Sequence, residues 1–304
     1  MLHPMMASAG LLAILLPGIY QPGEPNPSAP ASMMDPAPPV MTLRDALDQR
    51  LVSVEPVSLG GHSGECVSLQ VQNHSLRPMT LLLPAGTVFA PANDEDQSLV
   101  VPVERQLALS GRATESLPAV AFCTEMSDSS PAEASGFGLS KTTNPLLDSM
   151  FGYLALHPSL ASYPDVLQNG IWAITDNSDV GSIFAEGQPE VTAFREWICK
   201  LTGRDNVWYN TVLDTRLDEE RRIVRTAVSV QGQVMLNRRE SLTLQGHVEN
   251  ELGEVVWSFE RATRMPAGTA RFRFSLEVEG WQSGGYAVVY KSGEEEIIRQ
   301  EFRI

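Results

Sequence analysis

The chain has 304 residues, a formal net charge of −15 and a hydrophobic content of 43%. This length predicts two domains, because a single hydrophobic core usually stops growing at about 250–300 residues. The acidic balance, without any dense cluster of Lys and Arg, argues against nucleic acid as a partner. Cys66, Cys123 and Cys199 are too few for a disulfide framework and share no metal-ligand spacing, so we expect no metal and no other cofactor.

The first 41 residues predict export followed by a linker. Residues 1–20 are interpreted as a signal peptide, because the apolar stretch 7–20 is too short to span a bilayer. This segment lacks Lys and Arg before its apolar part, and a buried N-terminal segment is the alternative. Residues 21–41 are rich in proline and form a predicted linker. We therefore expect an extracellular or cell-surface protein.

Residues 42–205 predict one α+β domain. Thr42 is placed to cap a short helix, and short alternating strands with turn residues between them then predict a β-sandwich. Three short helices follow, which begin at Asn144-Pro145, at Pro164 and at Gln188-Pro189. The strands are expected at 51–59, 66–72, 79–83, 87–90, 98–109 and 116–123.

The remaining residues predict a linker and a second domain. Residues 206–227 are rich in charge and are interpreted as a linker. From 228 to 304 the hydrophobic period returns to two, which predicts an Ig-like sandwich. The predicted fold class is α+β, with an N-terminal β-sandwich and three short helices, followed by a C-terminal Ig-like all-β sandwich.

One pair of residues could carry covalent chemistry. Cys123 ends a predicted strand beside Phe122, and Gln168 lies one helical turn before Trp172. A cysteine thiolate can attack a glutamine carboxamide and release ammonia, which leaves an internal thioester that a lysine amine could open. Phe122 and Trp172 would help to exclude water. The alternative is that Cys123 packs as a small hydrophobic residue while Gln168 binds loop backbone.

A resemblance to a known family appears at these residues. LQNGIW at 167–172 and AFC at 121–123 resemble the Thr-Gln-x-Ala-Ile-Trp motif and the aromatic-flanked cysteine of bacterial surface thioester domains. The resemblance spans about 118–176, and Leu167 and Gly170 depart from it. It implies a binding or adhesion protein rather than an enzyme, with Cys123 and Gln168 as the thioester pair. The implied partner is an extracellular protein or a polysaccharide surface.

The last 70 residues carry a second resemblance. LQGHVENELGEVVWSF and GWQSGGYAVVYKSGEEEIIRQEFRI are similar to the C-terminal sorting domain of type IX secretion. The matching features are Gly253, Gly285-Tyr286, Gly293 and a final strand ending at Phe302. This resemblance implies the secretion machinery as a partner and the surface of a Gram-negative bacterium as the location. An ordinary accessory sandwich is the alternative.

Other functions remain open at this stage. Asn93–Asp96 and Asp176–Asp179 offer oxygen atoms that could suit Ca²⁺, although neither matches the twelve-residue calcium loop. An exported hydrolase with its site near Trp172 and the Asp176 loop is one alternative function. An inert structural protein of the cell envelope is another.

Overall fold

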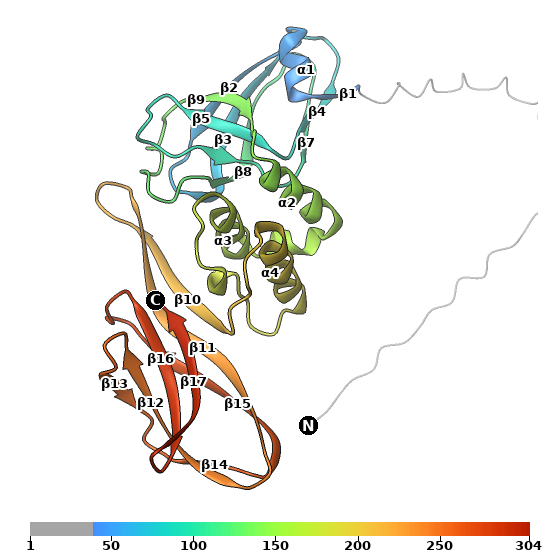
Figure 1. Cartoon of the computed structure of the whole chain (residues 1–304). Helices are drawn as coiled ribbons and strands as arrows, with labels where there is room; N and C mark the ends of the chain where they lie inside the picture. The colour runs from blue at the N-terminus through green and yellow to red at the C-terminus, as the bar shows by residue number, and fades with distance from the viewer. Residues whose placement is uncertain (1–38) are drawn as a thin grey trace, which may run out of the picture. The chain divides into compact units, whose positions relative to one another are not determined.

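Two β-sandwiches and a set of helices make up residues 39–304, the part of the chain that the computed structural model describes (Figure 1). The predicted α+β fold class is confirmed, with sandwiches at both ends of this part and the helices between them in the chain. The predicted signal peptide and most of the predicted linker lie outside the described residues. The end of that linker is instead a strand, because residues 40–42 pair in parallel with 80–82.

The N-terminal sandwich consists of two sheets. The larger has the strand order β2-β3-β8-β6-β5-β9 and the smaller has the order β1-β4-β7. The strands are β1 (Val40–Thr42), β2 (Val52–Ser58), β3 (Ser63–Asn73), β4 (Met79–Leu83), β5 (Thr87–Pro91), β6 (Leu99–Val100), β7 (Arg105–Leu109), β8 (Thr114–Cys123) and β9 (Phe137–Lys141).

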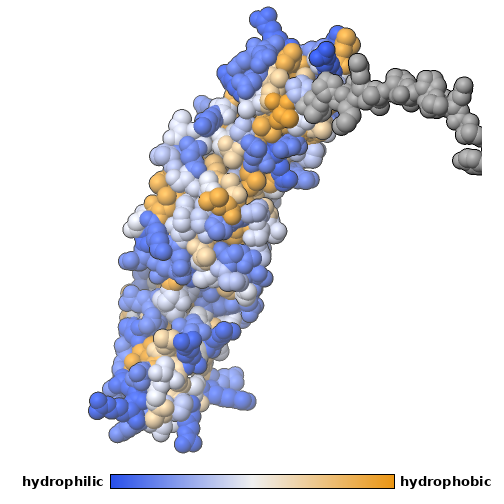
Figure 2. All heavy atoms as spheres, turned by 90° about the vertical axis from the view of Figure 1, so that its right-hand side faces the viewer, coloured by the Kyte–Doolittle hydropathy of each residue, from blue (hydrophilic) through white to orange (hydrophobic). Residues whose placement is uncertain are grey.

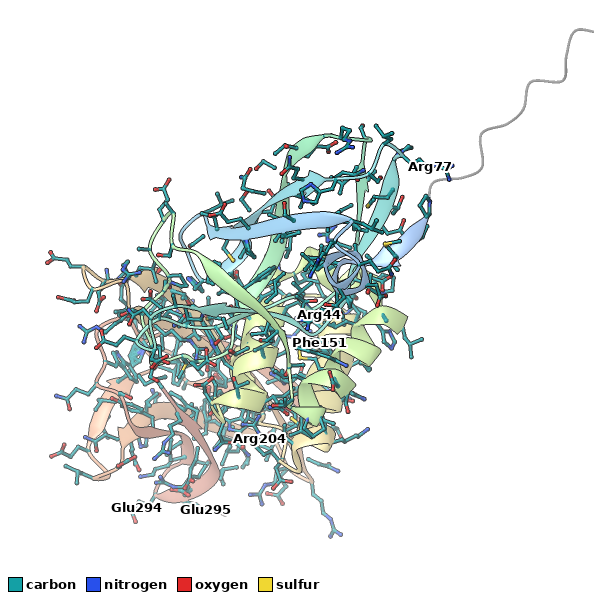
Figure 3. The ribbon with its side chains drawn as sticks, turned by 90° about the horizontal axis from the view of Figure 1, so that it is seen from above. Arg44, Arg77, Phe151, Arg204, Glu294 and Glu295 are labelled. Carbon is teal, nitrogen blue, oxygen red and sulfur yellow. The ribbon has the colours of Figure 1, made fainter. Side chains whose placement is uncertain are left out.

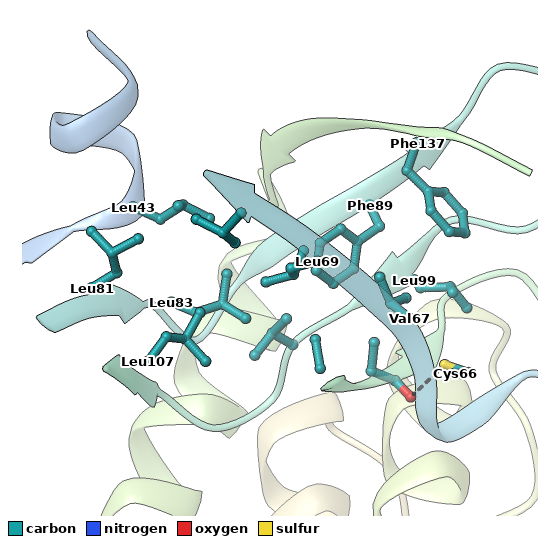
Figure 4. Close-up of a cluster of buried hydrophobic side chains, with 14 of the residues drawn as sticks. Leu43, Cys66, Val67, Leu69, Leu81, Leu83, Phe89, Leu99, Leu107 and Phe137 are labelled. Carbon is teal, nitrogen blue, oxygen red and sulfur yellow. Dashed lines mark hydrogen bonds between the residues drawn. The ribbon is translucent and has the colours of Figure 1, made fainter. Parts of the chain in front are cut away.

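Alternating apolar residues from both sheets form the core of this sandwich. Val67, Leu69 and Val71 of β3 are fully buried, as their period of two predicts. Leu81 and Leu83 of β4 enter the same cluster from the smaller sheet (Figure 4). A loop after β8 leads into β9, which pairs with β5 and extends the larger sheet.

Four α-helices have the predicted starts. They are α1 (Leu43–Asp48), α2 (Pro145–Leu156), α3 (Pro164–Thr175) and α4 (Pro189–Thr202), with the short 3₁₀ turns η1 (Pro158–Ser162) and η2 (Val180–Ser182). The side chains of Thr42 and Asn144 cap α1 and α2, and Gly203 ends α4 in the left-handed conformation. Helices α2–α4 share a second core with Phe122 and Val100 of the larger sheet. Within residues 39–304, no helix is both long enough and apolar enough to cross a membrane.

The C-terminal sandwich also consists of two sheets, around a third core. One has the order β10-β11-β15, and the other has the order β13-β12-β16-β17, with β14 also paired to β12. The strands are β10 (Tyr209–Leu217), β11 (Ile223–Arg238), β12 (Leu242–Asn250), β13 (Val255–Ser258), β14 (Thr263–Met265), β15 (Gly268–Glu277), β16 (Gly285–Ser292) and β17 (Glu295–Arg303).

The predicted linker at 206–227 is wrong. This segment folds into β10 and the start of β11. The two strands form an antiparallel hairpin in which residues 209–217 pair with residues 223–232. Its many charged residues lie on two paired strands, and most of these residues are half-buried or exposed. The charges therefore belong to the solvent-facing side of a hairpin and do not indicate a break between domains. The hairpin extends from the C-terminal sandwich toward the N-terminal sheets (Figure 1).

The face shown in Figure 2 has hydrophilic residues interspersed with small hydrophobic patches. Seen from above, Glu294 and Glu295 project from the C-terminal sandwich and Arg204 lies by the helices (Figure 3). This distribution agrees with the net charge of −15.

Candidate functional site: a buried cysteine and glutamine

Cys123 lies at the end of β8, inside the larger sheet of the N-terminal sandwich. It pairs with Leu99 of β6, and its side chain is fully buried. Its backbone N–H donates to the carbonyl oxygen of His62 at 2.9 Å. The strand therefore fixes the thiol in a place where bulk water has no access.

Gln168 meets Cys123 from α3. Its Oε1 accepts from the backbone N–H of Cys123 at 3.2 Å, and its Nε2 donates to the carbonyl oxygen of Cys123 at 2.9 Å. The same Oε1 lies 3.6 Å from Cys123 Sγ. Gln168 is 3% exposed, so the carboxamide lies within the core rather than on the rim of the helix. The two residues are thus brought together, with the carboxamide held on both sides by backbone.

Trp172 covers this pair one helical turn further along α3. It is 1% exposed and belongs to the core of the sandwich, whereas its neighbour Ile171 belongs to the helical core. His62 stacks on its ring with centroids 6.1 Å apart, and the Arg225 guanidinium lies 5.0 Å from the ring centroid. Its indole Nε1 is buried without a hydrogen-bond partner among the described residues.

The surroundings keep the thiol protonated. Burial raises the pKa of Cys123 well above its ordinary value, and the nearby Glu125 and Asp176 carboxylates raise it further. The nearby indole N–H of Trp172 lowers the pKa, although its position relative to the sulfur does not meet the geometry of a hydrogen bond. Burial also lowers the pKa of His62, which the Asp165 carboxylate partly opposes. A neutral imidazole therefore lies against Trp172 at neutral pH.

Phe122, the other expected supporting residue, lies on the wrong face. It is 1% exposed, but it packs in the helical core while Cys123 packs in the sandwich core. Consecutive residues of a strand point to opposite faces, which makes a shared environment impossible here. The water exclusion that we expected from Phe122 is supplied by Trp172.

Two neighbours of the site were missed in the sequence. His62 lies in a glycine-rich turn, and Arg225 lies in the segment that we interpreted as a linker. Both reach the site through contacts between residues far apart in the chain, since Arg225 binds Asn169 across 56 positions. The alternation of residues 223–230 was the available signal that Arg225 belongs to a strand.

In the two acidic loops considered for Ca²⁺, three carboxylates already bind other groups. Asp96 accepts from Arg221, Asp176 accepts from the backbone N–H of Met126, and Asp179 accepts from Gly181 and from the Tyr209 hydroxyl. Within residues 39–304, no group of three or more His, Cys, Asp or Glu is arranged to hold a metal ion.

A wide hollow lies away from the Cys123–Gln168 pair. It has a volume of about 750 Å³ and lies in the C-terminal sandwich, where Trp208, Tyr286 and Arg299 help to line it. Neither Trp172 nor Asp176 lines it, so this hollow offers nothing to a hydrolase site near Trp172.

Comparisons with known proteins give no relative. No family model matches the chain, and no curated protein matches it. Among solved structures, a selenomethionine-labelled β-glucosidase from Kluyveromyces marxianus is 11% identical over 78% of this chain and 44% of that chain. The matched region is therefore less than half of that structure. The TM-score is 0.21, so the similarity carries no argument about fold or activity.

Proposed function

We propose that this chain is a secreted or surface-attached binding protein in which Cys123 and Gln168 form an internal thioester. The observation that carries the proposal is the 3.6 Å contact between Cys123 Sγ and Gln168 Oε1 in a fully buried setting. A protein of this kind reacts once with its partner and does not turn over, so it is a binding protein rather than an enzyme.

The backbone around the pair suits the stabilisation of the oxyanion, while the raised pKa of Cys123 means that the sulfur attacks from the protonated thiol. The sulfur attacks Cδ of Gln168, while the Cys123 N–H that already binds Oε1 stabilises the developing oxyanion. Nε2 leaves as ammonia and takes the thiol proton, so atoms and charge balance. A partner amine then attacks the same carbon, forms an amide with the side chain of residue 168 and restores the Cys123 thiol.

The burial of the pair supports a long-lived bond. Thioesters hydrolyse when water reaches the carbonyl carbon, and both residues are at most 3% exposed beneath Trp172. The unpartnered Nε1–H of Trp172 is a further donor beside the pair. The raised pKa of the thiol also means that Cys123, once released, stays protonated and reacts slowly with external reagents.

Intact-mass measurement tests the thioester. We expect the purified protein to be about 17 Da lighter than its sequence, by the loss of ammonia, and to add methylamine. Cys123→Ala should abolish both effects. Cys66→Ala is the matched control, because Cys66 is a buried thiol of the neighbouring strand and should leave both effects intact. An unshifted mass, with Cys123 alkylated after denaturation, would show that Cys123 is an inert packing residue.

We also propose that the C-terminal sandwich serves export or attachment. Its own hydrophobic core and its final strand β17 support this role. The domain boundary must be placed at 206, because a cut at 228 would divide β11. Deleting 206–304 should leave the protein in the periplasm, and fusing 206–304 to a periplasmic reporter should bring that reporter to the surface. A reporter that stays in the periplasm while the truncated protein reaches the surface would refute this role.

A further inference from the structure

The tip of the β10–β11 hairpin is fastened to the N-terminal sandwich. The backbone N–H of Ser130 donates to the Arg221 carbonyl oxygen at 2.8 Å, and Ser129 pairs with Arg222 as an isolated antiparallel bridge. Arg221 also forms an ion pair with the buried Asp96 at 3.1 Å and donates to the Ser130 carbonyl oxygen. We call residues 209–227, the part of the hairpin that reaches the N-terminal sandwich, the strap.

Arg225 holds the strap against the Cys123–Gln168 site. Its guanidinium lies over the ring of Trp172 and donates to Asn169 Oδ1 at 2.7 Å and to Ser178 Oγ at 2.9 Å. It also contacts the Ser182 hydroxyl and the Met126 sulfur. These partners come from α3 and from the turns that follow it and β8, so one side chain fixes Trp172 relative to the end of β8.

The environment of Arg225 is unusual for a half-buried cation. Within residues 39–304 no carboxylate lies within ion-pair distance of it, and its Nε has no hydrogen-bond partner. Burial lowers the pKa of Arg225, and the more distant Asp179 and Asp176 oppose that effect. A half-buried charge without an ion-pair partner loses hydration that no carboxylate replaces, so this contact is held more weakly than its number of hydrogen bonds suggests.

We propose that the strap is a releasable cover of the Cys123–Gln168 site and that Arg225 is the positioning residue that keeps it closed. The first part of β11 carries Arg225, while residues 229–238 of the same strand pair with β15 inside the C-terminal sandwich. Movement of that sandwich therefore moves Arg225 and frees Trp172. This inference rests on the same site as the proposed thioester and states when that site becomes reactive.

The experiment measures access to Cys123 in the folded full-length protein. If the mass shows a thioester, the readout is the rate of methylamine addition; if it does not, the readout is the rate at which iodoacetamide alkylates Cys123. We expect Arg225→Met to raise either rate by about tenfold, because the open state becomes more populated. Arg225→Lys keeps the charge without the planar fork and should raise it less.

Two controls separate an open strap from general unfolding. Arg222→Met removes an exposed arginine of the same tip, paired with Asp218 and Glu220, and should leave the rate unchanged. Cys66 and Cys199 are buried thiols in the same protein and should stay unreactive in Arg225→Met. If Arg225→Met does not fold, Asn169→Ala removes its shortest hydrogen-bond acceptor and should give the same selective increase.

The outcomes distinguish the two proposals. An unchanged rate in folded Arg225→Met and Asn169→Ala, or equal increases at all three cysteines, would overturn the strap. A wild-type mass without the loss of ammonia would overturn the thioester, while the alkylation readout would still decide the strap.

Discussion

Gly170 lies where α3 crosses α4, and the position tolerates no side chain without movement. A Cβ there would lie 2.9 Å from Cζ of Phe194 and 3.2 Å from Cε of Met150. Ala at this position would favour the helix by about 1 kcal/mol, but overpacking a filled core costs about 1–3 kcal/mol. Packing against Phe194 and Met150 therefore accounts for a glycine at this position.

We predict that Gly170→Ala destabilises the protein by about 1 kcal/mol, because the cost of moving Phe194 exceeds the gain in helix propensity. Gly152→Ala is the matched control: Gly152 is an exposed residue of α2, and nothing lies within 4 Å of its added Cβ. That change should stabilise by about 0.5–1 kcal/mol. Urea unfolding of both variants measures the difference, and a stabilised Gly170→Ala would contradict the prediction.

At the scale of elements, the start of α2 shows how local sequence sets a boundary. Asn144 Oδ1 accepts from the backbone N–H of Leu146 at 3.0 Å, and Pro145 occupies the first turn, where a missing N–H has no cost. We predict that Asn144→Ala lowers the free energy of unfolding by about 1 kcal/mol, while Asn144→Asp retains the cap. Chemical denaturation of the two variants measures this. Equal decreases in the free energy of unfolding for both variants would contradict the prediction.

The elements that the sequence predicted are those with local signals. Caps such as Thr42 and Asn144, the proline at the starts of α2, α3 and α4, and the alternation of β3 depend on neighbours within a few positions. The strap was misjudged because its strands carry many charges and because its tip is held by residues far away in the chain. A hairpin between two domains has the composition of a linker.

The candidate site also has a part that local sequence predicts and a part that it does not. The meeting of Cys123 and Gln168 followed from placing one at a strand end and the other on a nearby helix. The face of Phe122 could have been predicted from strand alternation alone. The positions of His62 and Arg225 against Trp172 depend on tertiary packing, which no spacing in the sequence encodes.

At the scale of the molecule, the two sandwiches are joined by shared packing. Val207 packs against both the helical core and the C-terminal core, and Ile223 packs against the core of the N-terminal sandwich. Together with the fastened tip of the strap, these contacts couple two parts that the sequence predicted to be separate domains.

We predict that residues 39–304 unfold in one calorimetric transition, because breaking the strap exposes apolar surface of both sandwiches. The double variant Arg221→Ala with Arg225→Ala should split this transition in two, while Arg222→Ala should not. Scanning calorimetry on the full chain measures this. Two separate transitions in the unaltered protein would show that the coupling is weaker than the contacts imply.

Because β11 is long, it can transmit mechanical force between the C-terminal sandwich and the Cys123–Gln168 site. In the proposed state, Gln168 is bonded to a partner and the C-terminal sandwich is held at a surface, so force passes between them. The indole of Trp208, just before β10, donates to the Glu301 carbonyl oxygen of β17, and β11 pairs with β10 and β15 along most of its sixteen residues. A force along these strands has to break many hydrogen bonds at the same time. The contacts of Arg225 and of the hairpin tip are fewer and break one after another. A steady pull would therefore detach the strap long before it unravels either sandwich.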